Sequence, residues 1–506
     1  MNLQSGAKAA SPKAIYYDGT CPMCTVLMDK IGSSKAGESF DMKDATSEPL
    51  PRAISKEAVE RGIHVVDADG TVHKNSQAIL SIMAEYPRWK FLARIGKLPV
   101  IRQALEAGYR LISLHRHFLF GRASRIFWLK VVVAAGLCAG LISSFRLWAG
   151  ARSFPLVPAF RFLPALPPAA ATILFGLLLA LLLAVIFVPR PRKLIICISA
   201  IALIFAVGDQ MRWQPWFYQY AFMLGSLAFF SWNPGDEQGG RKALNTNRLI
   251  IGSIYFFSGL QKVNVAFMGS IFPWLIAPVA KFFPAQAAPV LYAFGILVPF
   301  MEMAIGIGLF SKKFRTYAVI GALLMHGFIL FSIGPFGHDW NSVVWPWNIA
   351  MMLLVLILFY KARDFSFRDL VWIRRFPYQK AVLVLFAVMP IASFFNMWDS
   401  YLSSTLYSGN TNSARLSVSD SVAEKLPAGA RQYLAESRSG GKILDFSTWS
   451  FAELNVPPYP ETRIFKAVGR YACRYADAPS DVLLDIYGKP TMFNRGWPTT
   501  YTCRDL

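Results

Sequence analysis

The chain has 506 residues, of which 54% are apolar and 14% aromatic, while only 16% are charged. A typical soluble domain carries roughly 25% charged residues, so this composition indicates a membrane protein. The formal net charge is +22, but the basic residues do not gather on one soluble segment and no nucleic-acid-binding motif occurs. We therefore expect a lipid bilayer and no nucleic acid as the partner of these charges.

Shifts in composition divide the chain into three zones. Residues 13–121 mix charges, turn residues and short apolar alternations, residues 122–397 consist mainly of apolar runs, and residues 398–506 are again of soluble character. We predict a multidomain membrane protein with an N-terminal thioredoxin-like α/β domain, a polytopic all-α membrane domain and a small α+β C-terminal domain in these zones. The sequence does not indicate an oligomeric state.

Two cysteines near the N-terminus carry the clearest chemistry in the chain. Cys21 and Cys24 follow a β-rich run and open a helical pattern that continues through Ile31. This context places both sulfurs at a helix N-terminus, where the helix dipole stabilises negative charge and lowers the pKa of a thiol. We expect Cys21 to be the more exposed thiol and the attacking one, and Cys24 to resolve the mixed disulfide.

A structural zinc site and a pair of idle thiols are the alternatives for these cysteines. Zinc would need two further ligands, and the spacing of the nearby His64 and His73 is not a zinc pattern. We expect the two histidines to be a strand residue and a hairpin residue on either side of a turn at residues 67–70. No metal site is predicted.

The cysteine motif resembles the signature of the DCC family of thiol–disulfide oxidoreductases. Asp18, Gly19 and Pro22 complete the pattern Tyr-Asp-Gly-x-Cys-Pro-x-Cys. Three later stretches look similar to the family as well, residues 66–70, 76–79 and 109–121. The resemblance implies a thioredoxin-like fold and an enzyme of the protein-disulfide reductase type, acting on a thiol or disulfide of a protein or small molecule. Unlike thioredoxins, the chain has no proline just before the strand expected at residues 63–67.

Nine apolar runs in the middle zone approach the length of about 20 residues that a membrane-spanning helix needs. They lie near residues 126–145, 169–188, 194–210, 214–231, 248–263, 288–310, 315–335, 342–360 and 380–397. The apolar segment 269–284 is short and contains three prolines. We expect this segment to be interfacial or re-entrant and not a tenth span.

The basic residues between the apolar runs predict the orientation in the membrane. A cytoplasmic N-terminus places the larger basic clusters on the inner side, in agreement with the positive-inside rule. These clusters include Arg190, Arg192 and Lys193, then Arg241, Lys242 and Arg248, and then Lys312, Lys313 and Arg315. An odd number of spans then makes the C-terminal domain extracytoplasmic, in an inner or plasma membrane.

The C-terminal zone contains two cysteines, Cys473 and Cys503. An extracytoplasmic position is oxidising, so we expect the two residues to form a structural disulfide. Two buried thiols are the alternative.

Three ionisable residues lie within apolar runs, and such residues are functional candidates. They are Lys262, Glu302 and His326. A buried lysine can act as a base, or it can extend its charge to the membrane surface from a span end. Glu302 can instead be a structural partner of Lys262 or His326.

The segment around Lys262, followed by His326 and by residues 330–336, resembles the vitamin K-dependent γ-carboxylase superfamily. Its bacterial members are called horizontally transferred transmembrane domains. The similarity covers about residues 122–400 and implies that Lys262 acts as a base towards a reduced quinone, with His326 in the same membrane core. At residues 216–220 the chain has aromatics in place of another functional histidine, which argues against carboxylation. We expect no obligatory cofactor, but a quinone or vitamin K-like hydroquinone as a membrane ligand.

Three functional hypotheses follow. In the first, the Cys21–Cys24 dithiol is a membrane-bound oxidoreductase that exchanges electrons with a quinone-like ligand. In the second, the membrane domain is the main enzyme, carboxylase-like or quinone-oxidising, with Lys262 as its base. In the third, the membrane domain only tethers the redox domain.

Overall fold

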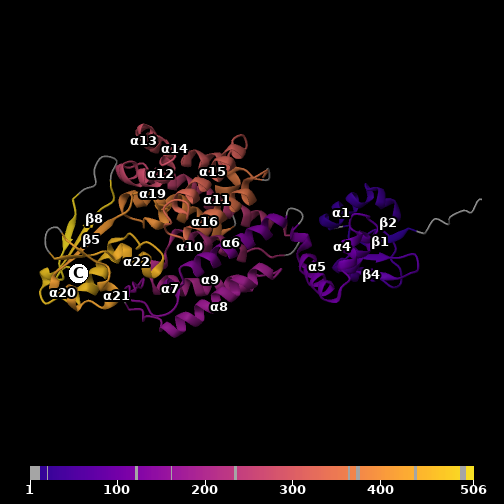
Figure 1. Ribbon diagram of the computed structural model, residues 1–506, viewed down its shortest axis with the longest axis horizontal. Helices are drawn as coiled ribbons and strands as arrows, with labels where there is room; N and C mark the ends of the chain where they lie inside the picture. Colours follow the sequence, from indigo (N-terminus) through magenta and orange to yellow (C-terminus); the bar gives the residue numbers. More distant parts are fainter. Residues whose placement is uncertain are drawn as a thin grey trace, which may run out of the picture. The chain divides into compact units, whose positions relative to one another are not determined.

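The computed structural model describes residues 12–19, 21–119, 123–160, 162–232, 236–362, 365–371, 376–437, 441–490 and 497–506. The chain forms two compact units, residues 1–128 and 129–506 (Figure 1). The predicted boundary between residues 121 and 122 lies outside the described residues. The predicted C-terminal domain and the helical zone belong to the same unit.

The N-terminal unit is the predicted α/β domain. Its sheet has the strand order β2-β1-β3-β4, in which β1 runs parallel to β2 and antiparallel to β3, and β3 pairs with β4 as a hairpin. The strands are β1 (Lys13–Tyr17), β2 (Phe40–Asp44), β3 (His64–Val66) and β4 (Val72–Lys74). The helices are α1 (Pro22–Gly32), α2 (Lys56–Arg61), α3 (Ser76–Ala84), α4 (Lys90–Ile95) and α5 (Pro99–Leu119), with a 3₁₀ turn at Lys35–Ser39.

Successive side chains of β1 point to opposite faces of the sheet, so the strand buries residues on both faces. Ile15 belongs to a core cluster with residues of α1 and α3. Tyr16 belongs to a second cluster with Ile54 and with Val59 of α2. The strand that leads to Cys21 is therefore held from both sides.

The predicted turn between β3 and β4 is confirmed. The amide of Asp67 donates to the carbonyl of Thr71 at 3.0 Å, and Gly70 closes the turn with a φ of 86°. His64 is buried in β3, where Nδ1 lies 2.9 Å from the carbonyl oxygen of Gly62. His73 lies in β4 and contacts Asp67 at 2.9 Å, so both histidines occupy the expected strand and hairpin positions.

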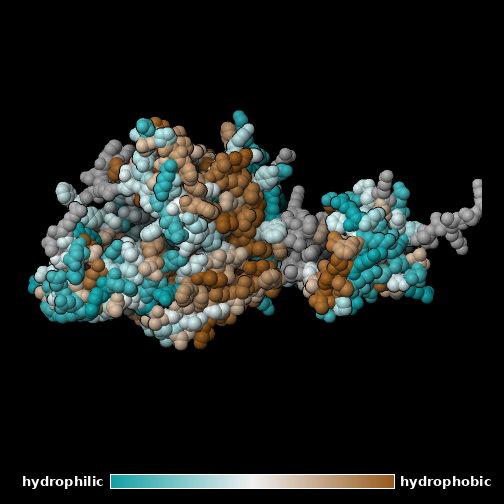
Figure 2. All heavy atoms as spheres, viewed as in Figure 1, coloured by the Kyte–Doolittle hydropathy of each residue, from teal (hydrophilic) through white to brown (hydrophobic). Residues whose placement is uncertain are grey.

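The second unit is largely helical up to residue 403, and Figure 2 shows apolar side chains gathered over this part of its surface. Its longer helices are α6 (Ala123–Ser143), α8 (Pro168–Phe187), α9 (Arg192–Gly208), α10 (Pro215–Ala228), α11 (Glu237–Gln261), α14 (Val298–Phe310), α15 (Arg315–Ile333) and α16 (Val344–Phe359). The shorter ones are α7 (Phe145–Trp148), α12 (Phe272–Ala280), α13 (Ala288–Ala293), α17 (Phe367–Val371), α18 (Pro377–Leu383) and α19 (Met389–Ala392).

The prediction of nine spans is wrong. Among the described residues, four helices are long and apolar enough to cross a membrane, or five if one bent pair is a single span. The four are Arg125–Ser143, Pro168–Phe187, Arg315–Ile333 and Pro377–Phe395. The bent pair, Ala285–Ile296 with Val298–Phe310, turns by 42°. These helices indicate a membrane protein, and the orientation of its termini stays a prediction.

The length of the helices and the burial of polar side chains explain why fewer spans are found than were predicted. Helices α10 and α16 have only 14 and 16 residues, less than the roughly 20 that cross a bilayer. The helix α11 is long enough, but it buries a run of polar side chains from Asn245 to Arg248. The segment 269–284 contains the short helix α12, in agreement with its exclusion as a span.

Two arginines that were predicted to lie in two different inner loops, Arg248 and Arg315, are buried. Arg248 donates through Nε to the carbonyl of Leu358 at 2.9 Å, and Arg315 donates through Nε to the carbonyl of Leu309 at 2.9 Å. Both guanidinium groups lie 4.0 Å from the centre of the Phe365 ring. These charges therefore hold the ends of α14 and α16, where helices leave carbonyls unpaired.

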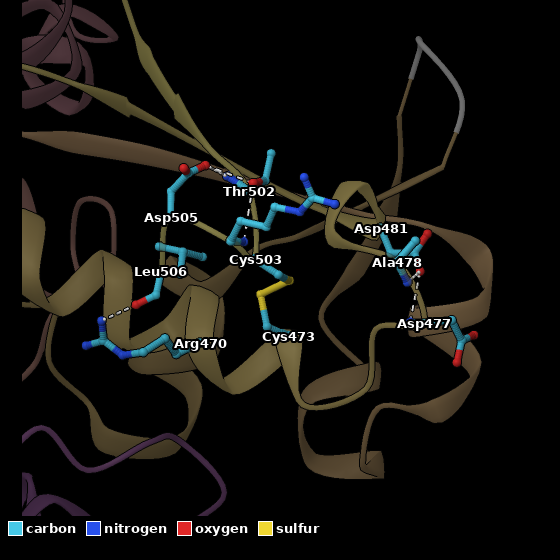
Figure 3. Close-up of a disulfide and its surroundings, with 10 residues drawn as sticks. Arg470, Cys473, Asp477, Ala478, Asp481, Thr502, Cys503, Asp505 and Leu506 are labelled. Carbon is cyan, nitrogen blue, oxygen red and sulfur yellow. Dashed lines mark hydrogen bonds between the residues drawn. A yellow bond between two sulfur atoms is a disulfide. The ribbon is translucent and has the colours of Figure 1, made fainter.

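The C-terminal part carries an antiparallel sheet with the strand order β6-β7-β5-β8-β9. Its strands are β5 (Ser413–Val418), β6 (Leu434–Glu436), β7 (Lys442–Leu444), β8 (Val482–Tyr487) and β9 (Thr499–Tyr501). The helices are α20 (Asp420–Lys425), α21 (Ala428–Arg431), α22 (Phe446–Leu454) and α23 (Thr462–Cys473). A disulfide joins Cys473 at the end of α23 to Cys503 after β9 (Figure 3), so the structure pairs the two cysteines that the sequence analysis paired.

Candidate functional site

The cysteine motif lies in the turn between β1 and α1. The amide of Cys21 donates to the carbonyl of Asp18 at 3.1 Å, which closes the turn, and Asp18 is buried. Pro22 then occupies the first helical position, where the missing N–H costs no hydrogen bond. The local sequence therefore places the first cysteine at the helix start for reasons of backbone chemistry alone.

Cys21 is the N-cap residue of α1. Its sulfur accepts a hydrogen bond from the amide of Cys24 at 3.4 Å, and its carbonyl accepts one from the amide of Thr25 at 3.1 Å. The first turn of α1 contains no acidic residue. An amide donor and the positive end of the helix dipole thus both face the Cys21 sulfur, and both favour a thiolate there.

The prediction that Cys21 is the more exposed of the two thiols is wrong. Cys21 is fully buried, with an exposed fraction of 0%, whereas 6% of Cys24 is exposed. The Cys21 side chain caps α1 while lying out of contact with solvent. Both cysteines are therefore buried in this conformation.

Gly19 is required by the close approach of Asp44, the last residue of β2. A Cβ atom at position 19 would lie 2.0 Å from Oδ2 of Asp44. The Asp44 carboxylate accepts hydrogen bonds from the amide of Gly19 at 3.0 Å and from the amide and hydroxyl of Thr46 at 2.8 and 2.7 Å. Burial opposes ionisation, but these hydrogen bonds hold the pKa of Asp44 below its ordinary value.

Tyr17 adds a neutral hydroxyl beside this turn. Burial raises the pKa of Tyr17, and the charges of Asp44, Asp29, Glu48 and Cys24 raise it further. The phenol therefore stays protonated at neutral pH. The described residues contain no group of three or more histidine, cysteine or acidic side chains that could hold a metal ion.

A second candidate site lies in the helical unit. The structure brings Lys262, Glu302 and His326 together on the wall of one cavity of about 840 Å³. Most of the wall is apolar and comes from α11, α14, α15 and α16. The three ionisable residues that the sequence singled out thus face a common space, although they are far apart in the chain.

Lys262 and Glu302 form a buried ion pair at one side of this cavity. The Lys262 ammonium donates to Oε2 of Glu302 at 2.7 Å, to the hydroxyl of Ser258 at 2.6 Å and to the carbonyl of Ser258 at 3.1 Å. An ammonium has three donors, and all three are engaged. The Lys262 ammonium is therefore engaged within the unit, and Glu302 is its ion-pair partner.

His326 belongs to a separate chain of hydrogen bonds. Its Nδ1 lies 2.7 Å from Oδ1 of Asn348, and its Nε2 lies 2.7 Å from the hydroxyl of Tyr255. The amide nitrogen of Asn348 donates to the carbonyl of Val344 at 2.8 Å, so its Oδ1 must accept from Nδ1–H. A neutral His326 then accepts the Tyr255 proton at Nε2.

Ser258, Tyr255 and Asn348 were not among the site residues predicted from the sequence. Ser258 and Tyr255 precede Lys262 by four and seven residues in the helical pattern, so a helical face drawn from Lys262 would have included both. Asn348 has no such local signal, since α16 brings it to His326 only through tertiary packing.

The cavity also has an orphaned hydroxyl group. Tyr218 lines the cavity, and its hydroxyl is buried without a hydrogen-bond partner among the described residues. A buried hydroxyl without a partner costs free energy, so its place on a cavity wall suits a ligand with a polar atom. Tyr218 belongs to the aromatic run at residues 216–220.

Comparison with known proteins identifies the N-terminal unit. Residues 15–122 match the model of the family described as DCC1-like thiol-disulfide oxidoreductase. No curated protein and no solved structure matches the chain. The similarity of the helical unit to the γ-carboxylase superfamily stays a prediction. The chain thus contains, at residues 15–122, a DCC1-like thiol-disulfide oxidoreductase domain.

Proposed function

We propose that this protein is a membrane-bound thiol–disulfide oxidoreductase whose reaction is carried by the Cys21–Cys24 dithiol of a thioredoxin-like domain. The observation that carries the proposal is the position of Cys21 at the N-cap of α1, with the Cys24 amide directed at its sulfur. The βαβ unit followed by a hairpin and a helix supports the thioredoxin-like assignment.

The proposed exchange proceeds in two steps. The Cys21 thiolate attacks one sulfur of a substrate disulfide, forms a mixed disulfide and releases a substrate thiolate, which takes up a proton. The Cys24 thiolate then attacks the Cys21 sulfur, which releases the second substrate thiol and leaves a Cys21–Cys24 disulfide. Two electrons pass from the dithiol to the substrate, and the reverse sequence oxidises a substrate dithiol. A cytoplasmic domain would act in the reducing direction, because that compartment keeps thiols reduced.

The test is the midpoint potential of the Cys21–Cys24 pair in the purified full-length protein. We expect a reversible two-electron couple that disappears in Cys21→Ser and in Cys24→Ser. The matched control is Cys197→Ser, which changes a cysteine of α9 outside the motif and should leave the couple unchanged. A wild-type protein without a reversible couple would refute the proposed function.

The cavity supports a second function for the helical unit, the binding of a quinone-like molecule. Its apolar wall suits a lipid-soluble ring and tail, and the Tyr218 hydroxyl and the Lys262–Glu302 pair offer polar contacts. A bound quinone would supply an acceptor for two electrons. Glu302, whose Oε2 accepts a hydrogen bond from Lys262 at 2.7 Å, places a carboxylate beside the lysine at the cavity wall.

Variants separate the three functional hypotheses. Each is measured for disulfide reduction and for quinone turnover in the full-length protein. Loss of both activities in Cys21→Ser and in Lys262→Ala would support coupling, and dependence of quinone turnover on Lys262 alone would make the helical unit the main enzyme. Indifference of both activities to Lys262→Ala would support the tether. Lys281→Ala, which changes an exposed lysine of the same unit, is the matched control.

A further inference from the structure

The N-terminal unit exposes a continuous apolar and basic surface over α4 and the start of α5, which we call the α4–α5 surface (residues 87–105). Phe91 is 69% exposed and Val100 is 79% exposed. Its other exposed apolar side chains are Trp89, Leu92, Leu98 and Leu105. In Figure 2, apolar atoms gather beside hydrophilic ones on this unit, in the region that Figure 1 labels α4 and α5. A soluble domain rarely leaves such a contiguous apolar surface in water.

The charge of this surface has a single sign. Its basic residues are Arg88, Lys90, Arg94, Lys97 and Arg102, and all five are exposed. No acidic residue occurs between Glu85 and Glu106. Glu85 is paired with Lys13 at 2.8 Å, and Glu106 accepts hydrogen bonds from Asn75, Ser76 and Arg110. The flanking carboxylates are thus engaged elsewhere in the unit and do not neutralise the surface.

Packing on α3 presents this surface outward. Ala93 is buried, and Gly96 lies so close to α3 that a Cβ atom there would approach Cδ2 of Leu80 to 2.5 Å. These small residues pack against the core on the inner side of the segment, so its large side chains face away from the core. The exposed phenylalanine and tryptophan follow from the packing and do not result from a frayed end.

We propose that the α4–α5 surface docks on the anionic lipid surface of the membrane in which the chain is anchored. Aromatic and aliphatic side chains with a basic rim are the composition of interfacial membrane-binding segments, and each lysine or arginine near anionic lipid raises binding about fivefold. A protein interface is instead depleted in lysine, whereas Lys90 and Lys97 lie within this surface.

Chain connectivity brings this surface within reach of the bilayer. The helix α5 ends at Leu119, and α6, which contains the first candidate span, begins at Ala123. With 21 residues, α5 is about 32 Å long. Val100, at its start, can therefore contact lipid if α5 lies along the membrane surface. This inference does not depend on turnover by the dithiol.

Photo-crosslinking in the full-length protein tests this docking. A benzophenone amino acid replaces Phe91, or Val26 of α1, which is 55% exposed and serves as the matched control. The protein is placed in nanodiscs of phosphatidylcholine with or without phosphatidylglycerol. We expect lipid adducts at position 91 when phosphatidylglycerol is present, at least about fivefold fewer without it or at high salt, and few at position 26.

Charge reversal provides the second arm. Combined Lys90→Glu, Arg94→Glu and Lys97→Glu should lower the lipid adducts at position 91 at least about fivefold. The control variant combines Lys30→Glu, Lys56→Glu and Lys74→Glu, which removes the same charge from exposed positions outside the surface. Adducts from position 91 to peptides of the second unit or of another copy would overturn the proposal. Equal lipid adducts at positions 91 and 26, or adducts indifferent to lipid charge, would overturn it as well.

Discussion

Removing both members of the Lys262–Glu302 pair should destabilise the helical unit less than the sum of the two single removals. At a separation of 2.7 Å, the Coulomb attraction is about 6 kcal/mol for an effective dielectric constant of about 20. Desolvation of two nearly buried groups offsets much of this gain. Glu302→Gln leaves the ammonium without its counter-charge, and Lys262→Met leaves the carboxylate without its donor. Each change should therefore cost about 3–5 kcal/mol of unfolding free energy.

The assay is a double-mutant cycle on the purified protein in mixed micelles, with unfolding followed by denaturant titration. The double variant carries neither charge, so it should be less destabilised than the sum of the single variants by at least about 2 kcal/mol. Lys281→Met, at an exposed position of the same unit, should change stability by at most about 0.5 kcal/mol. Single-variant effects that add to within about 0.5 kcal/mol would refute the buried ion pair.

Three further changes test the rest of the structure. Replacing Cys473 and Cys503 by serine removes a disulfide between residues 30 apart in the chain, which should lower the unfolding free energy by about 3–4 kcal/mol. Thermal unfolding with and without reductant would measure this loss, and an unchanged transition would contradict a structural disulfide. Gly19→Ala places a Cβ atom 2.0 Å from the Asp44 carboxylate and should destabilise the N-terminal unit by about 1–3 kcal/mol. The control Gly108→Ala lies in open space on α5 and should stabilise the unit by about 0.5–1 kcal/mol. Equal effects of the two variants in thermal scans would rule out the close contact at Gly19. Burial opposes ionisation of Glu106, but hydrogen bonds from Ser76, Asn75 and Arg110 hold its pKa below the ordinary value of 4.5. The depressed folded-state pKa gives stability that is present above the ordinary value and lost as the pH falls through the folded value, so Glu106→Gln should flatten the acid side of the stability profile, and an unchanged profile would contradict this role.

The predictions for the cysteine motif and the first hairpin came from local rules. A β-rich run, a turn and a proline at the first helical position are close in sequence, so their backbone chemistry determines where Cys21 and Cys24 lie in the fold. The turn between β3 and β4 is likewise a short-range feature. The family match at residues 15–122 is consistent with this part of the sequence reading.

The span count failed because hydropathy measures composition and not helix length. Several apolar runs form helices that are too short or that bend, and α11 buries polar residues against other helices. The predicted orientation counted Arg248 and Arg315 as loop charges, whereas packing buries both against Phe365. Sequence patterns identify apolar segments, but they do not predict which parts of the fold the polar side chains will contact.

The sequence by itself therefore determined the chemistry at each position: a dithiol at a helix start, and a lysine, a glutamate and a histidine within apolar runs. Only the tertiary structure decided which of these groups meet. It placed Lys262 on Glu302 and His326 between Tyr255 and Asn348, and it buried the sulfur of Cys21. Contacts between residues far apart in the chain depend on how helices and strands pack in three dimensions, and local propensity does not predict that packing.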